Sequence, residues 1–189
     1  MNNLVEQAKL FADQAHQAVD QRRKYTGEPY INHPVAVLRL LETHSSDPVC
    51  DAQRAAALLH DVVEDTEVTI EEIEDHFGTE VAELVGWLTD VSKPEDGNRR
   101  TRKALDLAHT ALAPRAAKNI KLCDLVHNAT DITDHDPGFA RVWLREKESL
   151  LKVLSDSDHV LLKLAHNTLD LCKNRLKEAT AWRTENKQA

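Results

Sequence analysis

The stretch AALLHDVVEDT, residues 56–66, places four ionisable side chains in an otherwise apolar helical pattern. At about 100° per residue, His60 and Glu64 fall on one face of the predicted helix, as do Asp61 and Asp65. Burying these groups unpaired would cost free energy, so the pattern predicts a positive partner among them. The alternative is a helix end frayed into solvent, with the two last acids as hydrated surface groups.

The rest of the chain has helical patterns of the same kind. Its 189 residues include five glycines and 4% aromatic residues, and apolar residues recur at steps of three and four, which predicts an all-α fold without strands. Pro34 marks a first helical turn, and Thr69 begins a T-I-E-E capping box. We expect one domain of roughly eight to ten helices over residues 1–180, followed by a frayed tail at 181–189. The predicted helices cover about residues 3–19, 34–43, 48–66, 69–77, 79–90, 99–112, 114–131, 139–154 and 156–180.

Composition narrows the class of protein and of partner. The net charge of −8 argues against nucleic acid or an anionic membrane as partner, because the overall field repels polyanions. The longest apolar run, residues 55–59, is too short to span a bilayer, and the first twenty residues lack the features of a secretory signal. Cys50, Cys123 and Cys172 have no metal-ligand spacing, as expected of reduced thiols. We therefore expect a cytoplasmic protein, and the sequence leaves its oligomeric state open.

Two further polar segments add potential ligands to the cluster in residues 56–66. Residues 32–34 read Asn-His-Pro and place an imidazole at a helix start, and residues 120–128 read IKLCDLVHN and carry a carboxylate in mid-helix. Two imidazoles and two carboxylates suit Mn²⁺, with Zn²⁺, Fe²⁺ and Co²⁺ as other possibilities. Spacing alone does not establish ligands so far apart in the chain. The four candidate ligands are His33, His60, Asp61 and Asp124.

These segments resemble the HD-domain superfamily of metal-dependent phosphohydrolases. Within it, the chain is most similar to the hydrolase domain of the RelA/SpoT alarmone enzymes and their small stand-alone relatives. The resemblance runs in order over about residues 5–130, and it implies an all-α bundle that is a hydrolase only, without a synthetase domain. The matching segments are Arg22-Arg23-Lys24, GEPYINHP (27–34), AALLHDVVEDT (56–66), FG (77–78), VAELV (81–85) and IKLCDLVHN (120–128).

The resemblance also implies a reaction and a set of residues for it. The expected substrate is guanosine tetra- or pentaphosphate, (p)ppGpp, from which a water activated by the metal removes the 3′-pyrophosphate to give GDP or GTP. Two acids would orient or deprotonate that water and manage the proton for the 3′ oxygen, with their individual roles left open. By this resemblance the metal, usually Mn²⁺, is held by His33, His60, Asp61 and Asp124, and the catalytic pair is Glu64 and Asp65.

Substrate phosphates need local cations in so acidic a chain. Arg23 and Lys24, close to the His-Pro motif, are the main candidates, and Arg99 and Arg102 form a second basic cluster. Asn128 corresponds to the family asparagine near the ribose. We expect these five residues to bind the substrate.

Other substrates and a different class of function remain open. The family usually has basic residues at the positions of Leu125 and Thr130, so this chain lacks two cations there. An adenosine alarmone, (p)ppApp, or the 2′-phosphate of NADPH is therefore an alternative substrate. A non-catalytic nucleotide-sensing module is a further alternative, and the complete set of catalytic-type residues argues against it.

Overall fold

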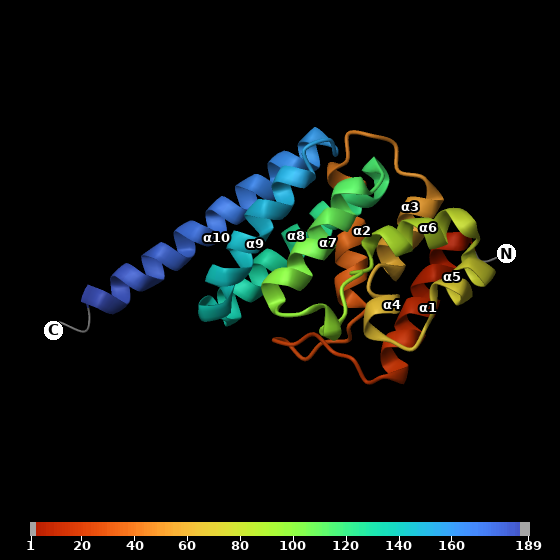
Figure 1. The fold of residues 1–189 in the computed structure, drawn as a ribbon, viewed down its shortest axis with the longest axis horizontal. Helices are drawn as coiled ribbons and strands as arrows, with labels where there is room; N and C mark the ends of the chain where they lie inside the picture. The colour runs from red at the N-terminus through yellow and green to blue at the C-terminus, as the bar shows by residue number, and fades with distance from the viewer. Residues whose placement is uncertain (1–2, 186–189) are drawn as a thin grey trace.

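The computed structural model describes residues 3–185, with side chains through residue 179, and this part of the chain is helical (Figure 1). The prediction of an all-α fold is confirmed, since strand-like pairing in the described residues is limited to one isolated bridge between Arg22 and Pro29. None of the described helices is long and apolar enough to cross a membrane. The elements are α1 (Leu4–Ala18), α2 (Asn32–His44), α3 (Asp51–Leu59), α4 (Val62–Asp65), α5 (Ile70–Phe77), α6 (Thr79–Leu88), the 3-10 turn η1 (Pro94–Asp96), α7 (Arg99–Leu112), α8 (Arg115–His135), α9 (Pro137–Val153) and α10 (His159–Glu185).

Helix α8 lies in the middle of the bundle and contacts α2, α3, α6, α9 and α10, while α1 packs on α3. Ile120, Leu122 and Leu125 of α8 are fully buried. Helix α10 runs along one side of the molecule (Figure 1). Because α8 is enclosed by several neighbours, the polar side chains it carries are held in fixed positions.

The predicted continuous helix through residues 56–66 is wrong. Helix α3 ends at Leu59 and α4 starts at Val62. The imidazole Nδ1 of His60 lies 2.9 Å from the carbonyl oxygen of Ala57. An uninterrupted helix would give that oxygen to the N–H of Asp61, so the side chain replaces a backbone donor at the break.

Two boundaries in the C-terminal half also differ from the sequence prediction. Helix α8 continues to His135, and the side chain of Asp136 then accepts a hydrogen bond from the N–H of Phe139 to cap α9. The last helix extends to Glu185, past its predicted end at residue 180. This segment contains few poor helix formers. Residues 186–189 lie outside the described residues.

The buried carboxylate of Asp158 joins the start of α10 to the loop after α2. It accepts hydrogen bonds from the N–H and hydroxyl of Ser46 at 2.7 and 2.6 Å and from the N–H groups of Val160 and Leu161 at 2.8 and 3.1 Å. Burial alone would raise the pKa of Asp158, but these donors outweigh it and lower the pKa. The charged form therefore stabilises the fold.

Replacing Asp158→Asn should lower the free energy of unfolding by about 2 kcal/mol or more at neutral pH, because N–H donors would face an amide NH₂ group. A carboxyl with a depressed pKa stabilises fully above its unfolded pKa of about 4 and loses that contribution as the pH falls. Urea unfolding at several pH values should therefore show wild type and variant converging below about pH 4. The exposed Asp75→Asn is the matched control, and equal stability of Asp158→Asn and wild type at neutral pH would contradict the interpretation.

Candidate active site

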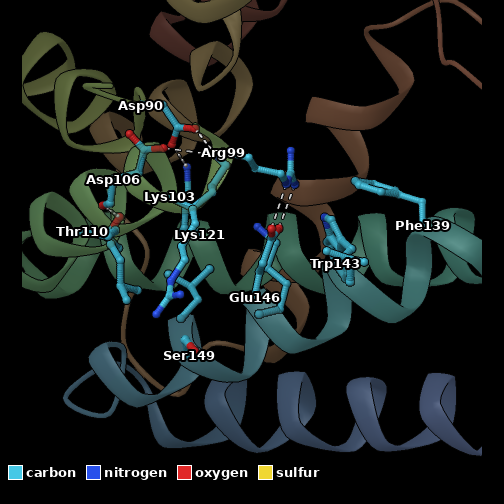
Figure 2. Close-up of a pocket in the computed structure, with 16 residues that line it drawn as sticks. Asp90, Arg99, Lys103, Asp106, Thr110, Lys121, Phe139, Trp143, Glu146 and Ser149 are labelled. Atoms are coloured by element: carbon cyan, nitrogen blue, oxygen red, sulfur yellow. Dashed lines mark hydrogen bonds and ion pairs between the residues drawn. The ribbon is translucent and has the colours of Figure 1, made fainter. Parts of the chain in front are cut away.

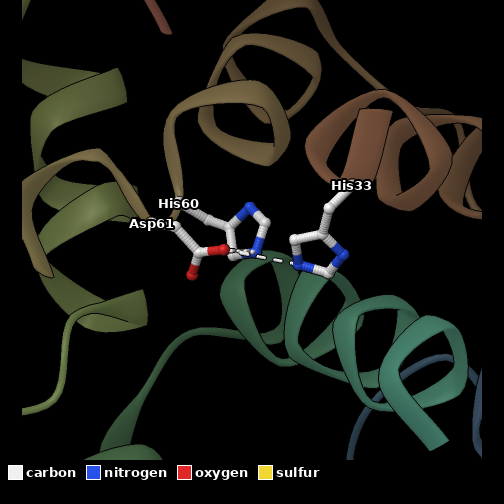
Figure 3. A group of neighbouring side chains, drawn as sticks. All are labelled: His33, His60 and Asp61. Atoms are coloured by element: carbon white, nitrogen blue, oxygen red, sulfur yellow. Dashed lines mark ion pairs between the residues drawn. The ribbon is translucent and has the colours of Figure 1, made fainter. Parts of the chain in front are cut away.

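Four ligand-type side chains from three parts of the chain meet beside α8. His33 lies in the first turn of α2, His60 and Asp61 occupy the break before α4, and Asp124 lies in the middle of α8. The Nε2 of His33 is 3.3 Å from Asp61 Oδ2 and 3.2 Å from Asp124 Oδ1. The Nε2 of His60 is 3.1 and 3.8 Å from the same two atoms. Figure 3 shows both imidazoles and the carboxylate of Asp61 converging on one point.

The donor set fits a divalent cation. In the part of the chain with described side chains, the buried Nε2 atoms of His33 and His60 have no hydrogen-bond partner. Because Nδ1 of His60 donates to Ala57, the neutral ring carries its lone pair on Nε2, where a metal would take the place of a proton. One ligand atom each from His33, His60 and Asp61 lies within 4.8 Å of the others. Two neutral imidazoles and two carboxylates would neutralise a charge of +2.

The electrostatics of the cluster favour a cation at the same point. Burial alone would raise the pKa of Asp61 and of Asp124, but the two imidazoles outweigh it and hold both pKa values well below the usual range. Burial alone would also lower the pKa of His33 and His60, but the carboxylates raise both. Each carboxylate is thus stabilised by positive charge where the ligand atoms meet.

A second layer of polar groups fixes the ligand side chains. The Tyr30 hydroxyl donates to Asp61 Oδ2 at 2.7 Å, and the Asn128 amide donates to Asp124 Oδ1 at 2.6 Å. The Nδ1 of His127 lies 2.8 Å from Nδ1 of His33, and burial lowers the pKa of His127 to about 4. Neutral His127 can therefore accept a hydrogen bond from His33 Nδ1, which leaves Nε2 of His33 available.

The two acids of α4 have different surroundings. The carboxylate of Glu64 accepts a hydrogen bond from the N–H of Asp90. Although Glu64 is exposed, loss of hydration raises the pKa of its carboxyl group to about 7, while the attraction of Lys121 acts in the opposite direction. Asp65 instead accepts a hydrogen bond at 2.7 Å from the Gln21 amide. A carboxyl group that titrates near neutrality can both accept and donate a proton.

Of the five predicted substrate-binding residues, Asn128 contacts Asp124 of the cluster and Arg23 contacts Asn128. Arg23 donates to Asn128 at 3.1 Å and forms an ion pair with Asp131 at 2.6 Å. Its charge thus has a carboxylate partner that the sequence did not predict. The ammonium of Lys24 lies 4.9 Å from the ring centroid of Tyr25 and 5.9 Å from that of Phe139.

A cavity of about 700 Å³ opens between α7, α8 and α9 (Figure 2). Its lining includes Lys121 and Asp90, which also surround Glu64, so the cavity lies beside Glu64 of α4. Cations outnumber acids in the lining, although the chain as a whole is acidic. Phe139 and Trp143 add aromatic surface. The charged lining residues are Arg99, Arg100, Lys103, Lys121, Lys147, Asp90, Asp106 and Glu146.

Predicted Arg99 lines this cavity, and its guanidinium forms a two-pronged contact with Glu146 at 2.8 Å. Arg102 is not part of the lining. Leu125 is fully buried in the core, and exposed Thr130 does not line the cavity either. The neutral residues at these two positions therefore do not remove cations from the cavity.

Three cations of this cavity are not among the residues predicted to bind the substrate, namely Lys103, Lys121 and Lys147. Burial alone would lower the pKa of Lys121, but the carboxylates around it raise the pKa, so its ammonium is firmly charged. Its position three residues before Asp124 on one helix was a usable sign. Lys147, whose ammonium lies 5.1 Å from the ring of Trp143, reaches the cavity only because α9 folds back on α8, and no local pattern contained that information.

Comparisons with known proteins identify the family of the chain. A model of the HD domain matches residues 8–154. The chain is 41% identical to guanosine-3′,5′-bis(diphosphate) 3′-pyrophosphohydrolase MESH1 of Xenopus tropicalis over 88% of this chain and 94% of that protein, and 39% identical to the Homo sapiens MESH1 over 69% and 70%. The solved structure of a metazoan orthologue of SpoT that hydrolyses ppGpp superposes with a TM-score of 0.79 at 26% identity, over 90% of this chain and 96% of that one. The chain therefore belongs to the HD-domain family.

Proposed function

We propose that this protein hydrolyses guanosine 3′,5′-bis(diphosphate), ppGpp, and its pentaphosphate form to GDP or GTP and pyrophosphate. The observation that carries the proposal is a two-histidine, two-carboxylate cluster next to a cation-lined cavity, with Lys121 lining the cavity and interacting electrostatically with Asp61 and Asp124 of the cluster. The names of relatives at about 40% identity support the same reaction. An enzyme of this kind needs a cation at the reacting phosphorus and further cations for the remaining phosphates.

We propose Mn²⁺ as the metal, held by His33, His60, Asp61 and Asp124, with other borderline-hard divalent ions as substitutes. When bound, such an ion would lower the pKa of a water molecule and polarise the phosphoryl oxygens. Tyr30, Asn128 and His127 would keep the ligand side chains oriented.

In this mechanism water attacks the 3′ diphosphate at the phosphorus next to the ribose. The bond from that phosphorus to the 3′ oxygen breaks, pyrophosphate leaves, and the 3′ oxygen takes up a proton. Glu64, with its near-neutral pKa, is suited to take the proton from the water and return it to the 3′ oxygen. Asp65 would orient the water. Lys121, close to Glu64, would offset the negative charge that develops at phosphorus.

The cavity between α7 and α9 would hold the remainder of the nucleotide. Its volume of about 700 Å³ is within the range of small-molecule sites. The rings of Phe139 and Trp143 can contact the base, and Lys103 and Lys147 can receive the 5′ phosphates. Lys24 and Arg99 both lie near the ring of Phe139, a residue of the lining, which supports a role for these two predicted residues in binding the nucleotide.

Variants of the cluster and of the acid pair should separate metal binding from turnover. Wild-type protein with Mn²⁺ should release GDP and pyrophosphate from ppGpp. Asp61→Ala should lose both metal and turnover. The double variant Glu64→Gln, Asp65→Asn should retain the metal, measured by elemental analysis, and lose turnover by about 100-fold or more, because it keeps shape but not proton-accepting charge.

The chain contains a matched control in Glu74-Asp75, an exposed acid pair on α5. Glu74→Gln, Asp75→Asn should leave metal content and turnover unchanged. Stoichiometric metal in Asp61→Ala would contradict the ligand assignment. Near-normal turnover in the Glu64 and Asp65 variant would contradict the role of the acid pair.

The pKa of Glu64 gives a pH test that does not require turnover. In metal-free protein, the side-chain carboxyl carbon of Glu64 should titrate in NMR spectra with a midpoint of about 7, because loss of hydration disfavours the charged form. Lys121→Met should move the midpoint upward, since the ammonium stabilises the carboxylate. A midpoint in the ordinary glutamate range, or a downward shift in the variant, would contradict this description of the site.

A further inference from the structure

The chain turns sharply at the end of α1, beside the acids of α4. Asp20 adopts a positive φ of 50°, which few non-glycine residues do. The N–H of Gln21 then donates to the carbonyl oxygen of His16 at 2.9 Å. This reversal directs the side chain of Gln21 toward Asp65 and away from the axis of α1.

The Gln21 side chain bridges two residues that are far apart in sequence. Its Nε2 donates to Asp65 Oδ2 at 2.7 Å, and its Oε1 lies 2.6 Å from Nδ1 of His16. A carboxylate only accepts hydrogen bonds, so the NH₂ group must face Asp65 and the amide oxygen must face His16. Nδ1 of His16 therefore carries the hydrogen. Turning the amide over would oppose two oxygens at Asp65, so Asp65 sets which way the amide faces, and the contact with His16 holds the amide in place.

His16 is itself fixed by its surroundings. It is 1% exposed, and its ring centroid lies 4.5 Å from that of Tyr30, whose hydroxyl donates to Asp61. Burial lowers the pKa of His16, which favours the neutral ring with a single N–H. Among the described side chains, Nε2 of His16 has no hydrogen-bond partner. The N–H of this ring is thus committed to Gln21.

Asp65 needs such a constraint because it lies at the end of the four-residue helix α4 and is exposed. An exposed aspartate would otherwise sample several rotamers. We propose that Gln21, held by His16, is a positioning residue that fixes the Asp65 carboxylate through Oδ2 and leaves Oδ1 for the attacking water. The inference rests on the proposed function, because it assigns Asp65 a part in that reaction.

The test compares Gln21→Met, which keeps length and removes both hydrogen bonds, with Gln17→Met at the exposed C-terminal end of α1. With Mn²⁺ and ppGpp, Gln21→Met should lower kcat about tenfold and change KM and the affinity for Mn²⁺ by less than about threefold. Gln17→Met should behave as wild type.

A double-mutant cycle distinguishes positioning from a general structural effect. If Gln21 acts through Asp65, Gln21→Met should lower kcat by less than about twofold in the Asp65→Asn background, because the carboxylate it orients is already absent. A merely structural role predicts the same tenfold loss in both backgrounds. His16→Asn, whose amide can replace the Nδ1 donor, should retain kcat within about threefold, whereas His16→Leu should resemble Gln21→Met.

The outcomes separate this inference from the proposed function. Absence of ppGpp cleavage by wild-type protein with Mn²⁺ would overturn both. Cleavage by wild type with an unchanged kcat in Gln21→Met, or an equal loss in the Asp65→Asn background, would overturn the positioning role alone. The expected result is a tenfold loss of kcat for Gln21→Met only in the background that retains Asp65. His16→Asn should keep kcat near the wild-type value, whereas His16→Leu should lose it.

Discussion

The hydrogen bond between His60 Nδ1 and the carbonyl of Ala57 is the interaction on which the site depends. It occurs where α3 ends, and it occupies the acceptor that would have continued the helix. The same bond selects the tautomer of His60 that leaves Nε2 free for a metal. Because the backbone breaks here, His60 and Asp61 face His33 and α8, and the acids of α4 face a different set of partners.

Helix α8 joins the cluster of His33, His60, Asp61 and Asp124 to the cavity between α7 and α9. One face of it supplies Asp124 to the cluster, Asn128 to the layer behind it, and Lys121 to the cavity. The opposite side of α8 is enclosed by the core, where Leu122 and Leu125 are fully buried. A rigid helix therefore fixes the position of Asp124 in the cluster relative to Lys121, the cation that attracts the Glu64 carboxylate. This arrangement explains how an acidic chain can present a local cationic surface to phosphates.

Periodicity and family resemblance predicted much of this molecule. The three- and four-residue spacing of apolar residues predicts the helices. The sequence motifs and the family resemblance together identify the four ligand-type residues. The helix break at residues 60–61 was not predictable from periodicity, because a helical wheel assumes an uninterrupted backbone. Lys147 and the pairing of Arg23 with Asp131 depend on contacts between segments far apart in the chain. The neutral Leu125 was misinterpreted as a missing substrate contact, because its burial was not visible in the sequence.

The central claim is that water attacks the phosphorus next to the ribose, at the cluster formed by His33, His60, Asp61 and Asp124. The most direct measurement is hydrolysis of ppGpp by the Mn²⁺-loaded protein in water enriched with the heavy oxygen isotope, followed by mass spectrometry of the products. The account predicts one labelled oxygen in pyrophosphate and none in GDP. Label in the 3′ hydroxyl of GDP, or release of orthophosphate as the first product, would contradict it.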